Sequence, residues 1–171
     1  MESYLLAWLV AGRHTSIDCF EKRGTKGFLF TIGDEKSWDK LEQNKLKKIL
    51  GYTECETLTD KQLLEEAQRM YNVYHIHINE ASYRDDPNVI GYWKDMIGER
   101  LIILNDYQAI CETIATIIAM QHGIDLTDVV SAFDSKTKGI VSSALAHVTT
   151  TITRAPGGTL STGDNDGVGT L

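Results

Sequence analysis

The chain has 171 residues, of which 42% are hydrophobic, and its formal net charge is −7 at pH 7. This length is sufficient for one domain with its own core. The acidic charge argues against nucleic acid and anionic membranes as partners, because both require a basic patch. No apolar run reaches the roughly 18 residues that span a bilayer. Together with widely spaced cysteines that form no CxxC pair, these features predict a cytoplasmic protein with free thiols.

Hydrophobic residues recur along the chain with two different periods, which predict a mixture of helices and strands. Helical patterns are found at 4–11, 37–51, 57–71, 89–96, 107–121, 125–133 and 135–148. Short runs rich in β-branched and aromatic residues predict strands at 28–32, 72–79 and 100–106. From residue 149 the composition is Thr, Gly, Ser and Asp, which predicts a flexible tail.

Residues that suit the ends of helices flank these segments. They are Ser3, Thr59, Asp86 with Pro87, Gly51 and Gly123. The pattern at 37–51 includes Leu41 in the buried stripe of its helix. The basic stretch at 21–26 contains a glutamate and precedes a strand, so we expect it to be a solvated loop.

The order of these elements predicts an α/β fold in which a mainly parallel sheet forms the middle of three layers, as in Rossmann-like proteins. Three strands are few for such a sheet, and the first strand has an open edge. The chain therefore resembles one half of a larger domain. We expect an α/β domain over 1–123, a helical extension over 124–148 and the flexible tail over 149–171.

Two carboxylates follow the first strand directly, in the stretch "GFLFTIGDE" at 27–35. In parallel sheets, ligands bind beyond the carboxyl ends of the strands. Asp34 and Glu35 are thus candidate ligands of a divalent cation, and capping of the following loop is the alternative. As neighbours in an extended chain they point to opposite sides, so two such carboxylates alone bind a cation weakly.

Several separate segments resemble intracellular bacterial and phage proteins with a von Willebrand factor type A (VWA) domain. They are "AGRHTSIDCFEKRGTKGFLFTIGDE", "YNVYHIHIN" and "WKDMIGERLIILND". The resemblance covers residues 4–123, about two thirds of the chain, and corresponds to the C-terminal half of the VWA domain. It implies a Rossmann-like sheet with a metal-ion-dependent adhesion site, which binds Mg²⁺ at the strand ends.

The resemblance places Asp34 near the metal ligand that follows the fourth VWA strand. The DxSxS motif that supplies other ligands is missing from this chain. We therefore expect a non-enzymatic protein-interaction module with an incomplete site, in which Mg²⁺ binds weakly or not at all. Partners implied by the resemblance are an AAA+ ATPase or a separately encoded N-terminal VWA half. A homo-oligomer through the open sheet edge is a further possibility.

Two other motifs have a catalytic or metal-binding interpretation. His75 and His77 share one face of a strand, which suits zinc, but no third ligand is evident and buried structural histidines are the favoured interpretation. Cys19 with His14 as base lacks an orienting third group, so a free thiol is favoured there.

An enzyme is the second functional hypothesis. Asp34 and Glu35, with Asp106 after the third strand, would serve a small Rossmann-like metal-dependent hydrolase or nucleotide-binding enzyme. No glycine-rich phosphate loop follows any of the strands. The interaction module therefore remains the preferred hypothesis.

Overall fold

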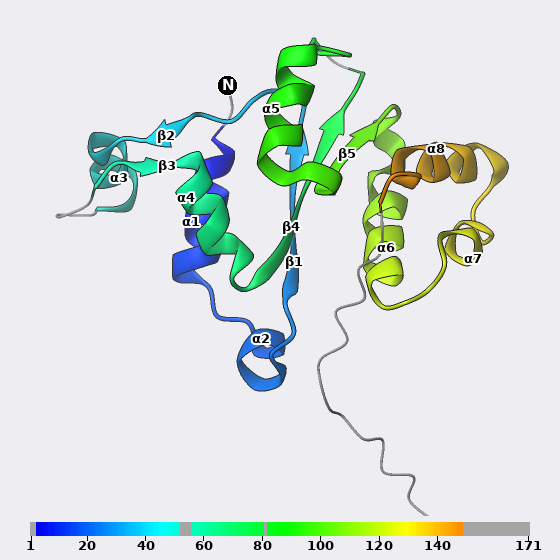
Figure 1. Cartoon of the computed structure of the whole chain (residues 1–171), viewed down its shortest axis with the longest axis horizontal. Helices are drawn as coiled ribbons and strands as arrows, with labels where there is room; N and C mark the ends of the chain where they lie inside the picture. The colour runs from blue at the N-terminus through cyan, green and yellow to red at the C-terminus, as the bar shows by residue number, and fades with distance from the viewer. Residues whose placement is uncertain (1–2, 52–55, 81, 149–171) are drawn as a thin grey trace, which may run out of the picture.

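The computed structural model of this chain describes residues 3–51, 56–80 and 82–148, and it has an α/β fold (Figure 1). Three strands, β1 (Gly27–Gly33), β4 (Tyr71–Ile78) and β5 (Leu101–Leu104), form a parallel sheet in the order β1-β4-β5. The three predicted strands and their parallel arrangement are thereby confirmed. The predicted tail at 149–171 and Cys55 lie outside the described residues.

Helices connect and flank these strands. They are α1 (Tyr4–His14), α2 (Asp18–Arg23), α3 (Gln43–Leu50), α4 (Asp60–Gln68), α5 (Pro87–Ile97), α6 (Ile110–Gln121), α7 (Leu126–Val130) and α8 (Ser135–Leu145). Two short 3₁₀ helices, η1 (Gly98–Arg100) and η2 (Tyr107–Ala109), precede β5 and α6. Within the part of the chain that the structure describes, no helix is long and apolar enough to cross a membrane.

Capping follows the sequence signals in most cases. Thr59 and Gln62 form a reciprocal capping box at the start of α4, and the Asp86 carboxylate accepts the backbone N–H groups of Asn88 and Val89 at the start of α5. Gly51 ends α3 in the left-handed conformation at φ 70°, which suits a residue without Cβ. The Ser3 residue holds the N-cap position of α1 without a capping hydrogen bond from its side chain.

Two local predictions are wrong. Leu41 belongs to the strand β2 (Lys40–Leu41), which pairs antiparallel with β3 (Leu58–Thr59), and the helix begins only at Gln43. The stretch at 21–26, expected to be a loop, contains the end of α2. Its acidic first turn and basic last turn, with Lys22 Nζ 2.7 Å from Asp18 Oδ2, favour a helix too short to show periodicity.

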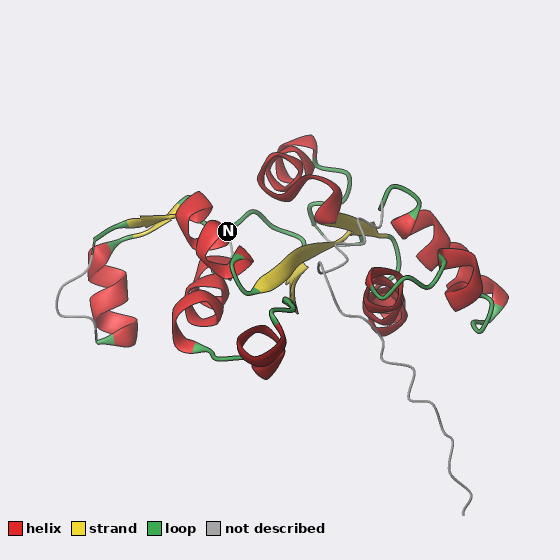
Figure 2. Ribbon diagram, turned by 60° about the horizontal axis from the view of Figure 1, so that its bottom comes forward, coloured by secondary structure: helices red, strands yellow, loops and turns green. Residues whose placement is uncertain are grey.

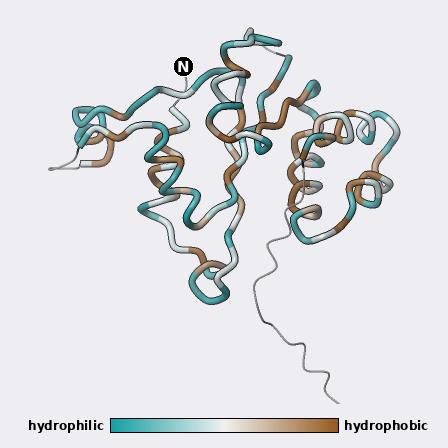
Figure 3. The backbone as a smooth tube through the Cα atoms, in the orientation of Figure 1, coloured by the Kyte–Doolittle hydropathy of each residue, from teal (hydrophilic) through white to brown (hydrophobic). Residues whose placement is uncertain are grey.

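Alternate side chains of the strands enter two separate cores, because both faces of the sheet are covered by helices (Figure 2). Val73 and Leu101 face α1, α4 and α5 and join a core centred on Trp8 and Trp93. Residues on the other face, such as Ile76, pack with α6, α7 and α8. Figure 3 shows the strongly hydrophobic residues gathered along α6 and the strands.

Candidate functional site

The residues after β1, β4 and β5 meet at the carboxyl end of the sheet, as the parallel order requires. Asn79, which follows β4, connects the loop after β4 to the residue that follows β5 through hydrogen bonds. Its amide Nδ2 donates to Asp85 Oδ1 and to Asn105 Oδ1, both at 2.9 Å, and its Oδ1 accepts the Asp85 N–H at 2.8 Å. Asp85 itself has φ +54°, a left-handed conformation that this double contact holds in place. Hydrogen bonds therefore fix Asn79, Asp85 and Asn105 relative to one another at the carboxyl end of the sheet.

Asp34 lies in this surface beside His77, because Gly33 is the register partner of His77 across the β1–β4 pair. The His77 side chain is fully buried, and neither ring nitrogen meets hydrogen-bond geometry with another described residue. Burial lowers the pKa of His77. The nearby Asp34 carboxylate, and then the Tyr83 backbone, Asp85 and Asp86, oppose this lowering. Asp34 is thus next to a neutral imidazole in a carboxylate-rich corner.

His75 occupies a different environment, one layer deeper along β4. Its Nδ1 lies 2.9 Å from the Thr31 hydroxyl, and its ring stacks on Trp93 with centroids 3.5 Å apart. Burial lowers the pKa of His75 well below its ordinary value, and the neighbouring His77 adds to the effect. The buried, hydrogen-bonded role expected for His75 is confirmed, and the expected burial is confirmed for His77 as well.

The other acids at this end have structural partners. Asp106 forms an ion pair with Lys136 Nζ at 2.8 Å and accepts the Gln108 N–H at 3.0 Å. Lys136 is the main cause of the lowered pKa of Asp106. Glu80 accepts the N–H of Tyr107 at 3.1 Å. The two carboxylates thereby hold η2 and α8 against the strand ends.

Glu35 turns its backbone inward, where its carbonyl oxygen accepts the indole N–H of Trp93 at 3.0 Å. Among the residues that the structure describes, no group of three or more histidine, cysteine, aspartate or glutamate side chains is arranged to hold a metal ion. Asp34 and Glu35 therefore lie at the predicted place in the fold, and neither belongs to a complete ligand set within the described ranges.

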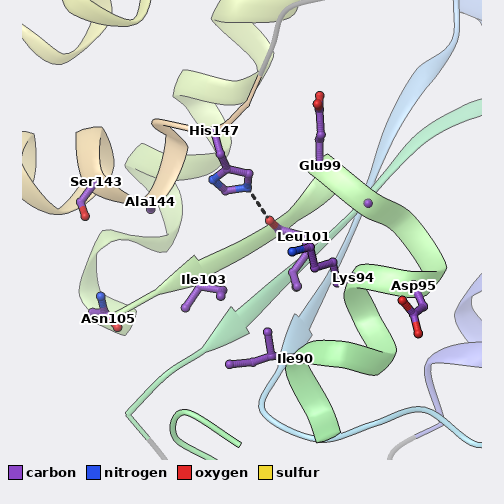
Figure 4. Close-up of a pocket in the computed structure, with 11 residues that line it drawn as sticks. Ile90, Lys94, Asp95, Glu99, Leu101, Ile103, Asn105, Ser143, Ala144 and His147 are labelled. Atoms are coloured by element: carbon purple, nitrogen blue, oxygen red, sulfur yellow. Dashed lines mark hydrogen bonds between the residues drawn. The ribbon is translucent and has the colours of Figure 1, made fainter. Parts of the chain in front are cut away.

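A groove of about 820 Å³ lies along the outer edge of β5 (Figure 4). Ile103 and Leu101 of β5 form its floor, Ile90 of α5 forms one wall, and Ala144 of α8 with the following His147 forms the other. His147 Nε2 donates to the Leu101 carbonyl oxygen at 2.9 Å. Sequence reasoning missed this groove, because His147 follows a helix end and has no motif around it.

The asparagines at the strand ends were also missed as functional elements, although the sequence carried a signal for them. Two of the three predicted strands, 72–79 and 100–106, contain an asparagine at or near their carboxyl end.

No family model, curated protein or solved structure matches this chain.

Proposed function

We propose that the chain is a non-enzymatic protein-interaction module with a VWA-like, Rossmann-like architecture, and that its partner pairs with the edge strand β1. The observation that supports this proposal most strongly is that β1 has a strand neighbour on one side and none on the other among the described residues. Within the described residues, β1 pairs with β4 alone. An uncovered edge strand is a ready template for another chain.

The register identifies which backbone groups of β1 face outward. The Gly27 N–H donates to the Met70 carbonyl oxygen, so Gly27 and every second residue after it turn toward β4. Phe28, Phe30 and Ile32 consequently turn their N–H and C=O groups away from the sheet. These groups match the spacing of an added strand.

The side chains of the same three residues form an apolar strip on the face of the sheet that packs against α6, α7 and α8. Phe28 and Phe30 are half-buried and stack on each other, with ring centroids 6.3 Å apart, and Ile32 is 39% exposed. An apolar strip beside unpaired backbone N–H and C=O groups is stabilised more by contact with another protein than by exposure to water. The acidic net charge also disfavours a nucleic-acid partner.

A second copy of the chain is the partner we propose for this edge. Two β1 strands related by a two-fold axis pair antiparallel. Each presents the same residues to the other, so one self-complementary surface is sufficient for the interface. The resemblance to VWA proteins offers a separately encoded N-terminal half for the same edge. It also suggests an AAA+ ATPase as a partner of the assembled module and a location in bacterial or phage-infected cytoplasm.

Weak Mg²⁺ binding, or none, is part of this proposal. Asp34 follows β1, near the point where the VWA resemblance implies a ligand, and burial lowers the pKa of the neighbouring His77. A cation bound by one carboxylate loop keeps most of its waters and gains little over bulk solution. A complete Mg²⁺ site would require a partner that supplies further oxygen ligands beside Asp34.

The enzyme hypothesis is less well supported. Of its three carboxylates, Asp106 is paired with Lys136 and caps η2, which leaves it poorly suited to proton transfer. A screen for nucleotide hydrolysis with Mg²⁺, using Asp34→Ala as the matched variant, tests this hypothesis. Turnover that requires Mg²⁺ and is lost in Asp34→Ala would replace the interaction module with an enzyme.

The interaction proposal is tested by sedimentation velocity of the full chain over a wide concentration range. We expect the wild type to dimerise, and Ile32→Lys, which places a charge in the apolar strip, to remain monomeric. Ile49→Lys is the matched control, because Ile49 is 51% exposed and belongs to α3, which lies away from β1 (Figure 1). A wild type that stays monomeric throughout, or equal effects of both lysine variants, would contradict pairing of two copies through β1.

A further inference from the structure

The backbone of β5 has an outward side that opens into the groove described above. The Asn79 N–H donates to the Leu104 carbonyl oxygen at 2.8 Å, so Leu104 and Ile102 turn their backbone groups toward β4. Leu101 and Ile103 therefore turn their N–H and C=O groups away from β4. This side of β5 is the edge of the sheet opposite to β1.

Strand pairing along this edge cannot continue past Leu101. The Leu101 N–H donates to the Gly98 carbonyl oxygen, and the Leu101 carbonyl oxygen accepts His147 Nε2 at 2.9 Å. Both groups that a long added strand would use at this position are thus already bonded within the chain. For the backbone of Ile103, the described part of the chain shows no hydrogen bond on the outward side. The β5 edge therefore suits the end of an extended chain rather than a long strand.

The charges of the groove distinguish a carboxyl end from an amino end. Figure 4 shows the Lys94 side chain extending from α5 to the Leu101 end of the groove. Within the described ranges its ammonium forms no ion pair. Asp95 and Glu99 also line the groove, but their carboxylates point away from Ile103 (Figure 4). The cation at the Leu101 end therefore favours a carboxylate there.

We propose that this groove binds the free carboxyl terminus of a partner protein, whose last residues are extended and run antiparallel to β5. In this direction the partner chain ends at Leu101, beside Lys94. Its last residue lies opposite Ile103, so its N–H donates to the Ile103 carbonyl oxygen and its carboxylate accepts the Ile103 N–H. The second carboxylate oxygen faces the Lys94 ammonium.

The same geometry selects an apolar last side chain. Residues directly opposite each other in an antiparallel pair have their side chains on the same face, so the last side chain lies beside Ile103. Ile90 of α5 forms the wall on that face, and the small Ala144 lies on the α8 side (Figure 4). The groove of about 820 Å³ has the size of a ligand pocket. We therefore expect valine, leucine or isoleucine as the last residue of the partner.

This site is separate from the β1 edge, so it stands or falls independently of the proposed dimer. Because β4 lies between β1 and β5, a dimer through β1 would carry one such groove at each end of its joined sheet.

Fluorescence anisotropy with the full chain tests the proposal. The probe is a short labelled peptide of serine and threonine that ends in isoleucine with a free carboxylate, and its matched form ends in a carboxamide. We expect saturable binding of the free acid and at least about tenfold weaker binding of the carboxamide. Lys94→Gln should weaken binding of the free acid about tenfold and leave the carboxamide unchanged. Lys48→Gln, at an exposed lysine of α3, is the matched control and should affect neither peptide.

Amide hydrogen exchange then locates the bound peptide. With a saturating amount of the free acid, the Ile103 amide should exchange at least about tenfold more slowly, while Phe30 and Ile32 of β1 stay unchanged. The proposal is overturned if neither peptide binds saturably, if both bind equally well, or if the two glutamine variants behave alike. Protection at Phe30 and Ile32 in place of Ile103 would also overturn it, because the peptide would then occupy the β1 edge.

Discussion

The two edges of the sheet differ in whether the chain itself supplies hydrogen-bond partners for the outward-facing backbone groups of the edge strand. At the β5 edge the chain itself supplies a donor, since His147 Nε2 bonds the Leu101 carbonyl oxygen and α8 forms a wall beside it. At the β1 edge the described residues supply none, and Ile32 is 39% exposed. Because unprotected edges invite pairing, this contrast favours β1 as the edge that a second chain would pair with.

Both edges depend on the central strand β4, and the largest expected effect comes from removing its support. Trp93 is fully buried, stacks on His75 and makes edge contacts with Tyr4 and Trp8. We expect Trp93→Ala to lower the free energy of unfolding by about 3–5 kcal/mol, through lost burial and the cavity left behind. Urea unfolding measures this, with the exposed Tyr107→Ala as the control that should change it by less than about 0.5 kcal/mol.

A similar loss in both variants would contradict the central role of Trp93. It would mean that the two edges are supported by other contacts, and that the packing of α5 on β4 does not control either of them.

The second expected effect is a dependence of stability on pH. Burial lowers the pKa of His75 in the folded protein, while in the unfolded chain it is near 6.5, so the unfolded state binds the proton first. Stability from this residue is therefore complete above pH 6.5. It falls by about 1.4 kcal/mol per pH unit between that value and the folded pKa. Urea unfolding from pH 8 to pH 5 measures the slope.

The His75→Asn variant is the control for this slope, because it removes the titrating group from the same site. The variant should be less stable at pH 8 and less sensitive to acid than the wild type. An equal loss between pH 8 and pH 5 in both proteins would assign the acid sensitivity to other groups.

The hydrogen bond at the β5 edge predicts a smaller effect, at His147. Removing its hydrogen bond to the Leu101 carbonyl oxygen should cost about 0.5–1.5 kcal/mol in the free energy of unfolding, as for a typical part-buried hydrogen bond. His147→Ala and Lys138→Ala are compared by urea unfolding, since Lys138 is an exposed residue of α8 and, of the two side chains, His147 is the one that bonds an edge carbonyl. Equal effects would remove the distinction between the β5 edge and the rest of the surface.

The smallest expected effect is at Asp34. With ligands from one loop alone, millimolar Mg²⁺ should add well under about 1 kcal/mol of stability, and Asp34→Ala should be nearly neutral in the isolated chain. Thermal melting with Mg²⁺, Mn²⁺ and EDTA measures this. Asp86→Ala is the matched carboxylate variant, and it should lower the melting temperature because Asp86 caps α5. A saturable Mg²⁺-dependent rise that Asp34→Ala removes would show that further ligands are present.

The longer elements of the fold could be predicted from the sequence because their patterns have a single physical cause. β1 was expected at 28–32 and spans Gly27–Gly33, since its short apolar run packs between the helices on the two faces of the sheet. Thr59 and Asp86 marked the starts of α4 and α5 through side chains that accept backbone N–H groups. Short elements such as α2 and the β2–β3 pair gave no period long enough to detect.

The candidate sites were predictable only where neighbours in sequence become neighbours in space. Asp34 followed from the end of β1, and the burial of His75 and His77 followed from their strand. The environment of His77 depends on how Asp34, Tyr83 and Asp85 surround it, and these residues belong to the segments that follow two different strands. The β5 groove depends on α8 returning to a strand about forty residues earlier, and no local pattern encodes that return.

The central claim is that β1 is the binding edge, and amide exchange along this strand tests it most directly. Leu29 and Thr31 turn their N–H groups to β4, whereas Phe30 and Ile32 turn theirs outward. We predict that raising the protein concentration slows exchange at Phe30 and Ile32 and leaves Leu29 and Thr31 unchanged. Fast exchange at Phe30 and Ile32 at every concentration, or equal slowing of all four amides, would contradict strand pairing at this edge.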